Sequence, residues 1–344
     1  MKPEGITADW LSYVLGGAVG SIRQESIGDG LVGMNIRVTL IDAPPELPNS
    51  VVVKLPSLDP TSSATGIALR TYEREVKFYS DVASTVDIRI PHCHHATWDE
   101  SSGDFVVVLE DMAPAHQGDQ ITGCGVESAE LAVVALAHLH GPRWNDPSLA
   151  DIEWLDRVSG PDHGAQLGTL WQMFFAGFSK TYRGYLTTEQ FELAEQFGPV
   201  IPAWIDGRDG PETITHGDYR LDNMLFGVDS GGPPITVVDW QTPGHGSPAT
   251  DLSYFCGAGL LPSDRREHER QLVDMYATAL TDHGVQVDET WLWEHYRRDA
   301  FAGVVMAVVA SQVVGKSDRS EAMFAAMATR HLQHALELDS LSLV

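Results

Sequence analysis

The hydrophobic pattern of this chain changes its period near residue 112, and that change limits the folds it can adopt. Three short β-branched segments precede the change, at 36–40, 51–55 and 105–109. Their apolar pattern is typical of strands, whereas residues 68–83 have helical spacing. The order predicts an α+β arrangement, with an antiparallel sheet and one packed helix in residues 1–112.

Helical periodicity dominates residues 113–344. The expected helices are 128–140, 164–185, 188–206, 263–283, 288–314 and 319–338. Only 213–239 breaks the pattern, and its turn residues and apolar runs predict a loop, a strand, a Gly/Pro turn and a second strand. The longest apolar run, 300–314, is shorter than the ~20 residues of a membrane span, so we expect a buried helix. The chain should divide into two domains, 1–112 and 113–344.

Charge and cysteine content narrow the class of partner. The chain has 22 Lys and Arg against 48 Asp and Glu, a net charge of −26, which repels nucleic-acid phosphates and anionic lipid. We therefore expect neither a nucleic acid nor a membrane as partner. The acidity indicates either a well-solvated surface or attraction for a cationic substrate. Three scattered cysteines without C-x-x-C spacing, and an N-terminus without a signal pattern, favour the cytoplasm.

Gly28, Gly30 and Gly33 form a G-x-G-x-x-G motif with three interpretations. A dinucleotide fold needs a helix directly after the glycines and an acid about 20 residues later, but a strand follows here and residues 48–53 contain no acid. A hairpin whose backbone covers the phosphates of ATP needs a strand, a loop, a strand and then a lysine on the next strand, and Lys54 meets that requirement. A plain glycine turn remains open.

Lys54 interrupts an apolar strand, where a buried ammonium group needs an acidic partner. Glu75 on the following helix is the favoured partner and would hold the lysine toward the α- and β-phosphates of a nucleotide. Glu73 is the competing choice. A lysine on an edge strand that extends into water is the purely structural alternative.

The segment 213–239 contains the strongest chemical signal. His216 and Asp218 are followed by Asn223, and then by Asp239 at the end of an apolar run. Phosphoryl transfer needs a carboxylate beside the attacking hydroxyl and hard oxygen ligands for Mg²⁺. Asp218 would orient the hydroxyl and accept its proton, Asn223 and Asp239 would bind the metal, and His216 would brace the loop. Unrelated turn residues could produce such a string, but the order of the motifs favours the functional interpretation.

Together these motifs resemble the aminoglycoside phosphotransferase and choline kinase-like family of small-molecule kinases, over nearly the whole chain. THGDYRLDNMLF resembles the family's catalytic loop, VVDWQ its metal-binding aspartate, VVVKL its nucleotide lysine, YEREVKFY its glutamate helix and VVVLEDM its interlobe hinge. Gln241, two residues after Asp239, is similar to the residue found there in the ecdysteroid-kinase-like branch. The Trp-Gln pair that follows Asp239 differs from the Phe-Gly of protein kinases.

The resemblance implies a bilobed protein-kinase-like fold, with an active site between the lobes. A small antiparallel-sheet N-lobe, residues 1–112, would bind the nucleotide, and a helical C-lobe, residues 113–344, would carry the catalytic loop and the acceptor site. Backbone groups around Glu110 to Met112 would hold adenine, and Asp251 would support the catalytic loop. The expected function is ATP- and Mg²⁺-dependent transfer of the γ-phosphoryl group to a hydroxyl of a small molecule.

Several alternatives stay open. A nucleotide-binding pseudokinase without turnover is the alternative function, although the base, the lysine and the metal ligands are all present. The acceptor is either cationic, as the acidity favours, or a hydrophobic alcohol, as the aromatic helices 164–185 and 288–314 favour. The oligomeric state is open too. His92, His94 and His95 invite a metal interpretation, but consecutive strand residues point to opposite faces, so we expect packing roles.

Overall fold

The three β-branched segments form β2, β3 and β5 of one five-stranded antiparallel sheet. The strands are β1 (Ser21–Ile27), β2 (Gly33–Ile41), β3 (Ser50–Pro56), β4 (Cys93–Trp98) and β5 (Phe105–Glu110). Their order across the sheet is β1-β2-β3-β5-β4, and neighbouring strands are antiparallel throughout. The computed structural model describes residues 1–28, 33–228 and 231–344, so Gly30 of the glycine motif lies outside the described residues.

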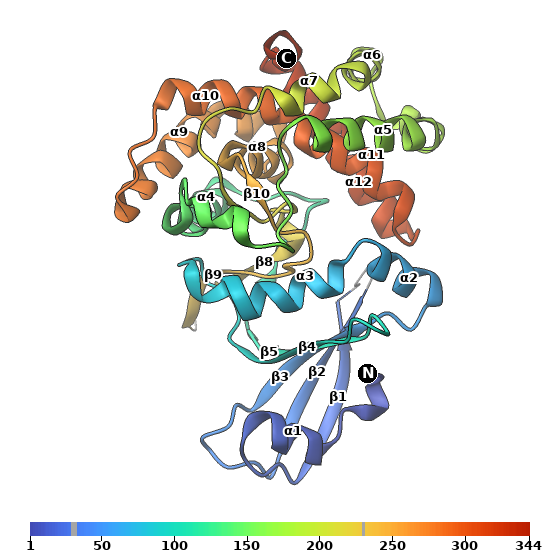
Figure 1. Cartoon of the computed structure of the whole chain (residues 1–344), viewed down its shortest axis with the longest axis vertical. Helices are drawn as coiled ribbons and strands as arrows, with labels where there is room; N and C mark the ends of the chain where they lie inside the picture. The colour runs from blue at the N-terminus through green and yellow to red at the C-terminus, as the bar shows by residue number, and fades with distance from the viewer. Residues whose placement is uncertain (29–32, 229–230) are drawn as a thin grey trace. The chain divides into compact units, whose positions relative to one another are not determined.

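The chain divides into two compact units (Figure 1). The first contains residues 1–84, 90–115 and 238–242, and the second contains residues 85–89, 116–237 and 243–344. The sheet belongs to the first unit. The short return at 238–242 brings Asp239, Trp240 and Gln241 into that same unit, although they follow the sheet by more than a hundred residues.

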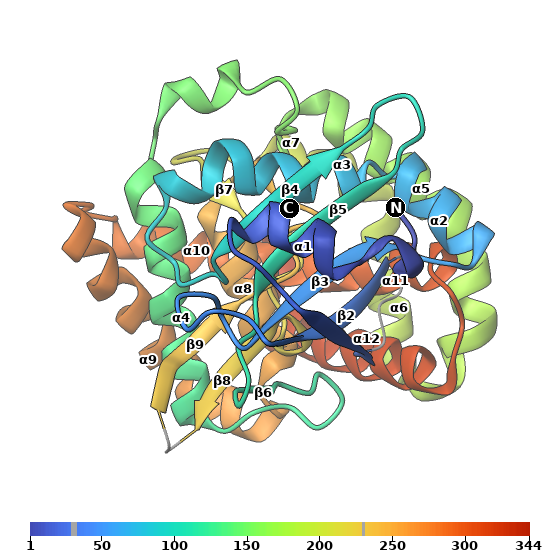
Figure 2. The same cartoon turned by 90° about the horizontal axis from the view of Figure 1, so that it is seen from below.

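Helices cover both faces of the sheet. They are α1 (Ala8–Leu15), α2 (Pro60–Ala68) and α3 (Thr71–Lys77), and α3 continues as a π-helical turn, Phe78–Val82. Val51 and Val53 are buried on the face covered by α1, which lies in front of the sheet in Figure 2, and Val107 packs against α3 on the other face. Because side chains alternate along a strand, Lys54 lies on the α3 face. The single helix predicted over 68–83 is wrong in its start, because Arg70 has a left-handed backbone and separates α2 from α3.

Helices make up most of the second unit. They are α4 (Val126–His140), α5 (Pro161–Tyr182), α6 (Thr188–Phe197), α7 (Ile201–Asp206), α8 (Pro248–Gly259), α9 (Pro262–Leu280), α10 (Glu289–Arg298), α11 (Ala302–Val313) and α12 (Asp318–Glu337). The predicted helix 188–206 is divided into α6 and α7 at Pro199, which has no backbone N–H. The predicted helix 288–314 is divided into α10 and α11 by a turn at Asp299, whose carboxylate accepts hydrogen bonds from Arg208 and Thr250.

Two small ladders frame the segment that carries the strongest motif. β7 (Thr213–Thr215) pairs with β10 (Gly244–Gly246), while β8 (Met224–Val228) pairs with β6 (His116–Gln117) and β9 (Gly231–Val237). A 3-10 turn, Leu221–Asn223, leads directly into β8. The two predicted strands are confirmed as β8 and β9, but residues 213–215 form a further strand, β7, and the Gly/Pro stretch 231–234, expected as a turn, begins β9. The segment 216–223 is anchored at both ends.

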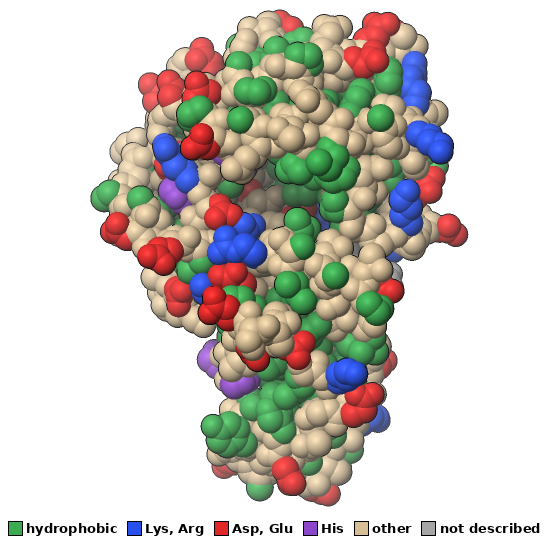
Figure 3. Space-filling model, turned by 45° about the vertical axis from the view of Figure 1, so that its right-hand side comes forward, with side chains coloured by type: hydrophobic (Ala, Val, Ile, Leu, Met, Phe, Trp, Pro, Cys, Tyr) green, Lys and Arg blue, Asp and Glu red, His purple; other side chains and the backbone are tan. Residues whose placement is uncertain are grey.

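Charged side chains are distributed rather than gathered on the face shown in Figure 3, where acidic residues are interspersed with basic and apolar ones. The longest apolar run contributes α11, which is largely buried. Among the helices in the described part of the chain, none has both the length and the apolar character that crossing a membrane requires.

Candidate active site

Lys54 of the first unit forms ion pairs with two carboxylates. Its side chain is 11% exposed, and Nζ lies 2.5 Å from Glu75 Oε1 and 2.9 Å from Asp239 Oδ1. The acidic partner on α3 is the fully buried Glu75, whereas Glu73 pairs with Lys77 on the same helix. Residues two apart on a helix face different directions, so only one of the two glutamates can reach the sheet.

Lys54 is charged in this environment. Burial by itself would lower the pKa of its ammonium group, but the carboxylates of Asp239 and Glu75 outweigh burial and raise the pKa of Lys54 above its ordinary value. A cation is thus held by two carboxylates from distant parts of the sequence.

The segment 238–242 holds the acidic partners of Lys54 in place. Asp239 has a left-handed backbone with φ 69°, a conformation that few residues other than glycine adopt but that aspartate tolerates better than most. Trp240 is buried and stacks on Phe78, with ring centroids 3.9 Å apart. Gln241 Nε2 donates to Glu75 Oε2 over 3.2 Å. The Trp-Gln pair therefore fixes both the chain beside Asp239 and the glutamate of α3.

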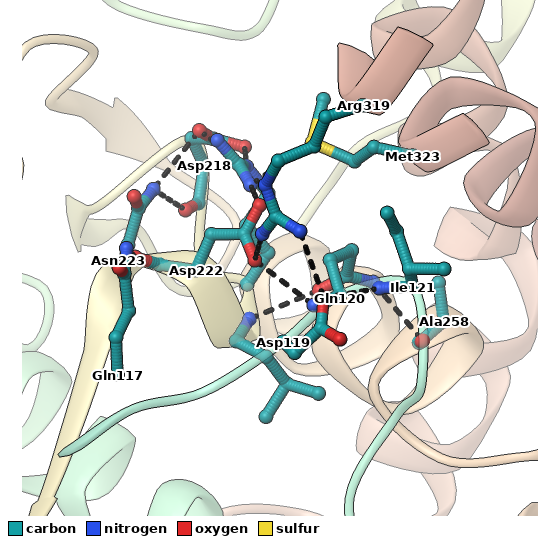
Figure 4. A network of polar contacts seen from close by, with 12 residues as sticks. Gln117, Asp119, Gln120, Ile121, Asp218, Asp222, Asn223, Ala258, Arg319 and Met323 are labelled. Carbon is teal, nitrogen blue, oxygen red and sulfur yellow. Dashed lines mark hydrogen bonds and ion pairs between the residues drawn. The ribbon is translucent and has the colours of Figure 1, made fainter. Parts of the chain in front are cut away.

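In the second unit, hydrogen-bond donors surround the carboxylate of Asp218 (Figure 4). Asn223 Nδ2 donates to Asp218 Oδ2 and to its backbone oxygen, both over 2.9 Å. Arg220 Nε lies 3.0 Å from Oδ1 and 2.9 Å from Oδ2, and Tyr254 Oη donates to Oδ1 over 2.7 Å. Because the amide nitrogen of Asn223 binds Asp218, its carbonyl oxygen is the atom left to coordinate a cation.

Asp251 of α8 holds the backbone that leads to Asp218. Its Oδ2 accepts from the N–H of His216 over 2.6 Å, and its Oδ1 accepts from the N–H of Gly217 over 3.0 Å. Burial would raise the pKa of Asp251, but interactions with His140 and His216 hold the pKa below its ordinary value. His216 is itself buried, and its Nδ1 accepts from the N–H of Asp218 over 3.3 Å. This contact lies within the loop, and the bracing role of His216 stays a prediction.

Asp222 and Arg319, which sequence analysis did not select, extend the network around Asp218. Asp222 Oδ2 lies 2.5 Å from Arg220 Nη1, and Oδ1 lies 3.2 Å from Arg319 Nη2 (Figure 4). The N–H of Gln120 also donates to Oδ1, over 2.9 Å. The charged pair Arg220 and Asp222 is visible within the loop motif, but Arg319 follows 97 residues after Asp222 and can be found only from the fold.

The described glycine and hinge residues of the prediction lie at or just beyond the ends of strands in the first unit's sheet. Gly28 (φ 69°) follows β1 and Gly33 begins β2, and both border a hollow of about 310 Å³. Glu110 ends β5, where its Oε2 accepts from the N–H of His92 over 3.0 Å. The carbonyl of Met112, just beyond β5, accepts from the N–H of Ala115 over 2.9 Å.

The two predicted magnesium ligands offer oxygen atoms, the donors that Mg²⁺ prefers. The side chain of Asp239 is 35% exposed, and the amide oxygen of Asn223 is oriented by the contact of its nitrogen with Asp218. Within the described residues, no group of three or more His, Cys, Asp or Glu side chains is arranged to hold a metal. Each residue thus offers a donor of the type that Mg²⁺ takes, Asp239 in the first unit and Asn223 in the second, and their shared role as metal ligands stays a prediction.

A cavity of about 160 Å³ lies between α5, α11 and α12 of the second unit. Its lining combines hydroxyl groups, aromatic rings and two opposite charges: Tyr182, Ser311, Lys316, Ser320, Glu321 and Phe324 are among the residues around it. α12 also carries Arg319 in its first turn, so the helix that borders the cavity reaches the network around Asp218.

Comparisons with known proteins agree with this geometry. The model of the ecdysteroid kinase-like family matches residues 179–288, which include the Asp218 loop, Asp239 and α8. Among curated proteins, acyl-CoA dehydrogenase family member 10 of Mus musculus is 41% identical over 86 residues. That match covers 25% of this chain and 8% of the relative's length.

Solved structures of small-molecule kinases have the same fold. Choline kinase from Cryptosporidium parvum Iowa II superposes with a TM-score of 0.59 at 10% identity, covering 94% of this chain and 91% of that one. Plasmodium vivax ethanolamine kinase gives 0.56 at 12% identity, covering 94% and 83%. Aminoglycoside 2′-phosphotransferase-IIIa in its GDP complex gives 0.55 at 13% identity, covering 94% of each chain. The family resemblance of the sequence is confirmed: the chain has the protein-kinase-like fold of small-molecule kinases, and its segment 179–288 matches the ecdysteroid kinase-like family.

Proposed function

We propose that this protein is a small-molecule kinase that transfers the γ-phosphoryl group of ATP, with Mg²⁺, to a hydroxyl of a small molecule. The observation that carries the proposal is the buried Lys54 held between Glu75 and Asp239. A second carboxylate, Asp218, is held by the amide of Asn223 in the other unit. Phosphoryl transfer relies on positioning and charge neutralisation, and these two sets supply both.

Each residue has a role that its contacts support. Lys54 offsets the negative charge of the α- and β-phosphates. Asp218 orients the acceptor hydroxyl and takes its proton as the new oxygen–phosphorus bond forms and the bond from the γ-phosphorus to the ADP oxygen breaks. Asn223 and Asp239 would be the ligands of Mg²⁺, which would supply positive charge to offset that of the phosphates.

The relatives support the nucleotide and the kind of acceptor. Aminoglycoside 2′-phosphotransferase-IIIa, which shares the fold, binds GDP, so GTP belongs beside ATP in any test. Choline kinase and ethanolamine kinase act on small amino alcohols, and both share the fold. We place the acceptor in the second unit, where the cavity between α5, α11 and α12 offers hydroxyl, aromatic and charged side chains.

The experiment that tests the proposal measures binding and transfer separately. Titration calorimetry with ATP, GTP and NAD, each with and without Mg²⁺, identifies the nucleotide. Transfer from the γ-³²P-labelled nucleotide is then followed on a panel of amino alcohols, aminoglycosides, hydroxy acids and sterols. Asp218→Asn should keep the nucleotide affinity while transfer falls about 10²- to 10⁴-fold. Asp239→Ala should weaken the binding of the Mg-nucleotide.

Asp288→Asn is the matched control, because Asp288 is an exposed cap of α10. It should leave both binding and transfer unchanged. Full transfer by Asp218→Asn would contradict the proton-acceptor role. Tight Mg-nucleotide binding without transfer or hydrolysis would favour a nucleotide-binding pseudokinase, and binding of NAD in place of ATP would overturn the kinase assignment.

A further inference from the structure

Helix α8 presents two side chains to the loop that carries Asp218. Asp251 and Tyr254 are three residues apart, so they lie on the same face of the helix. Asp251 accepts from the backbone N–H groups of His216 and Gly217, and Tyr254 Oη donates to Asp218 Oδ1 over 2.7 Å. One rigid, buried helix therefore holds both the loop backbone and the carboxylate.

The hydroxyl of Tyr254 helps to fix the rotation of the Asp218 carboxylate. The terminal torsion of an aspartate has a broad, two-fold energy profile, so its plane turns easily unless both oxygens are held. Asn223 Nδ2 holds Oδ2 over 2.9 Å, Arg220 Nε contacts both oxygens, and Tyr254 makes the shortest contact to Oδ1, over 2.7 Å. Because both carboxylate oxygens of Asp218 accept hydrogen bonds, the plane of the carboxylate is fixed and its remaining lone pairs point in a fixed direction. A carboxylate that must receive a proton from a bound hydroxyl needs this preorganisation.

The ring of Tyr254 is itself held by a close-fitting site. It stacks on His331 of α12 with ring centroids 5.3 Å apart and an interplanar angle of 19°. His331 in turn sits where two glycines leave room for it. A Cβ at Gly257 would lie 2.5 Å from His331 Nδ1, and a Cβ at Gly303 would lie 2.0 Å from Nε2. A side chain at either position would overlap the ring of His331. The glycines of α8 and α11 therefore determine the position of His331 and hence of Tyr254.

Tyr254 also remains a hydrogen-bond donor. Burial, followed by the negative charge of Asp218, raises the pKa of Tyr254 well above its ordinary value. The phenol therefore keeps its proton at neutral pH and points it at the carboxylate.

We propose that Tyr254 is a positioning residue for phosphoryl transfer, which acts by donating its hydroxyl hydrogen bond to Asp218 and fixing the orientation of that carboxylate. The inference rests on the proposed kinase function, because orientation of Asp218 matters to turnover only if Asp218 receives the acceptor proton. Tyr254 acts through Asp218 and not by contact with the nucleotide or the acceptor.

The test is Tyr254→Phe, which removes the hydroxyl and keeps the ring that stacks on His331. Its matched control is Tyr296→Phe, because Tyr296 is also buried in the second unit and its hydroxyl also donates to a carboxylate, Glu269 Oε2, over 3.1 Å. We expect kcat to fall about 10- to 100-fold in Tyr254→Phe, the loss of one hydrogen bond to a charged group. KM for the Mg-nucleotide should stay within about twofold, and Tyr296→Phe should keep the wild-type kcat.

A second measurement does not depend on turnover. In protein labelled with ¹³C at the aspartate carboxyl carbons, the Asp218 resonance is identified by its absence in Asp218→Asn. It should shift in Tyr254→Phe and not in Tyr296→Phe. A wild-type kcat in Tyr254→Phe, an equal loss in both tyrosine variants, or an unchanged Asp218 resonance would each overturn the inference. Absence of any transfer by the wild-type protein would refute the proposed function, while the resonance would still decide the Tyr254 contact.

Discussion

Replacement of Asp251 by asparagine tests how the loop that carries Asp218 is held. The two carboxylate oxygens of Asp251 serve different backbone donors, the N–H of His216 and the N–H of Gly217. Asparagine keeps one acceptor oxygen and presents an NH₂ group to the other donor. The shape of the side chain hardly changes, so the effect reports one buried hydrogen bond together with the charge of Asp251, which also lies 3.5 Å from His140 Nε2.

The size of the effect follows from these contacts. A hydrogen bond to a charged group contributes about 1.5–3 kcal/mol, and an unpaired buried donor costs about 1–3 kcal/mol. Since Asp251 is fully buried and one of its two backbone contacts is lost, we expect the free energy of unfolding to fall by about 2–4 kcal/mol. For a unit of this size, each kcal/mol lowers Tm by about 2–4 °C, so the melting transition of the second unit should move down by roughly 4–16 °C.

Calorimetric melting at neutral pH measures the shift, with Asp288→Asn as control, because asparagine caps a helix as well as aspartate does. Folding lowers the pKa of Asp251, so its stabilisation is present above the ordinary carboxyl pKa of 3.8 and is lost as the pH falls below it. The difference between wild type and variant should therefore narrow in acid. A Tm equal to that of the Asp288→Asn control at neutral pH would refute the reasoning.

Two further predictions concern α12 and the cavity beside it. Burial lowers the pKa of His331 well below its ordinary 6.5, and neither ring nitrogen has a hydrogen-bond partner among the described residues. The unfolded chain therefore binds a proton that the folded chain does not, so the free energy of unfolding should decrease as the pH falls below about 6.5, by up to about 1.4 kcal/mol per pH unit. Urea titrations between about pH 7.5 and 5.5 should show a shallower pH slope in His331→Leu, and equal slopes would contradict this. Glu321→Gln should raise KM for a cationic acceptor about tenfold and leave kcat unchanged, and Lys316→Met should do the same for an anionic acceptor. The reason is that each substitution removes a charged contact of about 1.4 kcal/mol. A wild-type KM in both variants would exclude the cavity as the acceptor site.

Strands β2, β3 and β5 could be predicted from the sequence because β-branched runs are local signals, whereas β1 and β4 contain no such run. Helix boundaries could not be predicted wherever a side chain elsewhere in the fold decides them. The turn between α10 and α11 depends on Asp299, whose partners are Arg208 and Thr250. Periodicity also does not predict α8, because nearly the whole helix is buried and no polar face marks it.

The predicted site residues divide in the same way. Asp218 and Asn223 lie within one short loop, so their contact follows from spacing and turn geometry. From the sequence, Glu75 is the favoured partner of Lys54 and Glu73 the competing choice, and the direction of α3 relative to the strand decides for Glu75. Tyr254 gives no signal in the sequence, because its contact with the carboxylate arises from the packing of α8 against the loop.

The net charge of −26 does not describe the surroundings of Asp218. The charged groups in contact there alternate in sign along the series Asp218, Arg220, Asp222 and Arg319, so their charges largely cancel. Charges on the exposed surface are screened over about 8 Å at physiological ionic strength. The overall acidity favours a cationic acceptor when the sequence is considered alone. With these contacts known, the net charge no longer indicates the charge of the acceptor. If the cavity between α5, α11 and α12 is the acceptor site, as proposed, the charge of the acceptor depends instead on Lys316 and Glu321, whose opposite signs accommodate a neutral or zwitterionic alcohol as well as a cationic one.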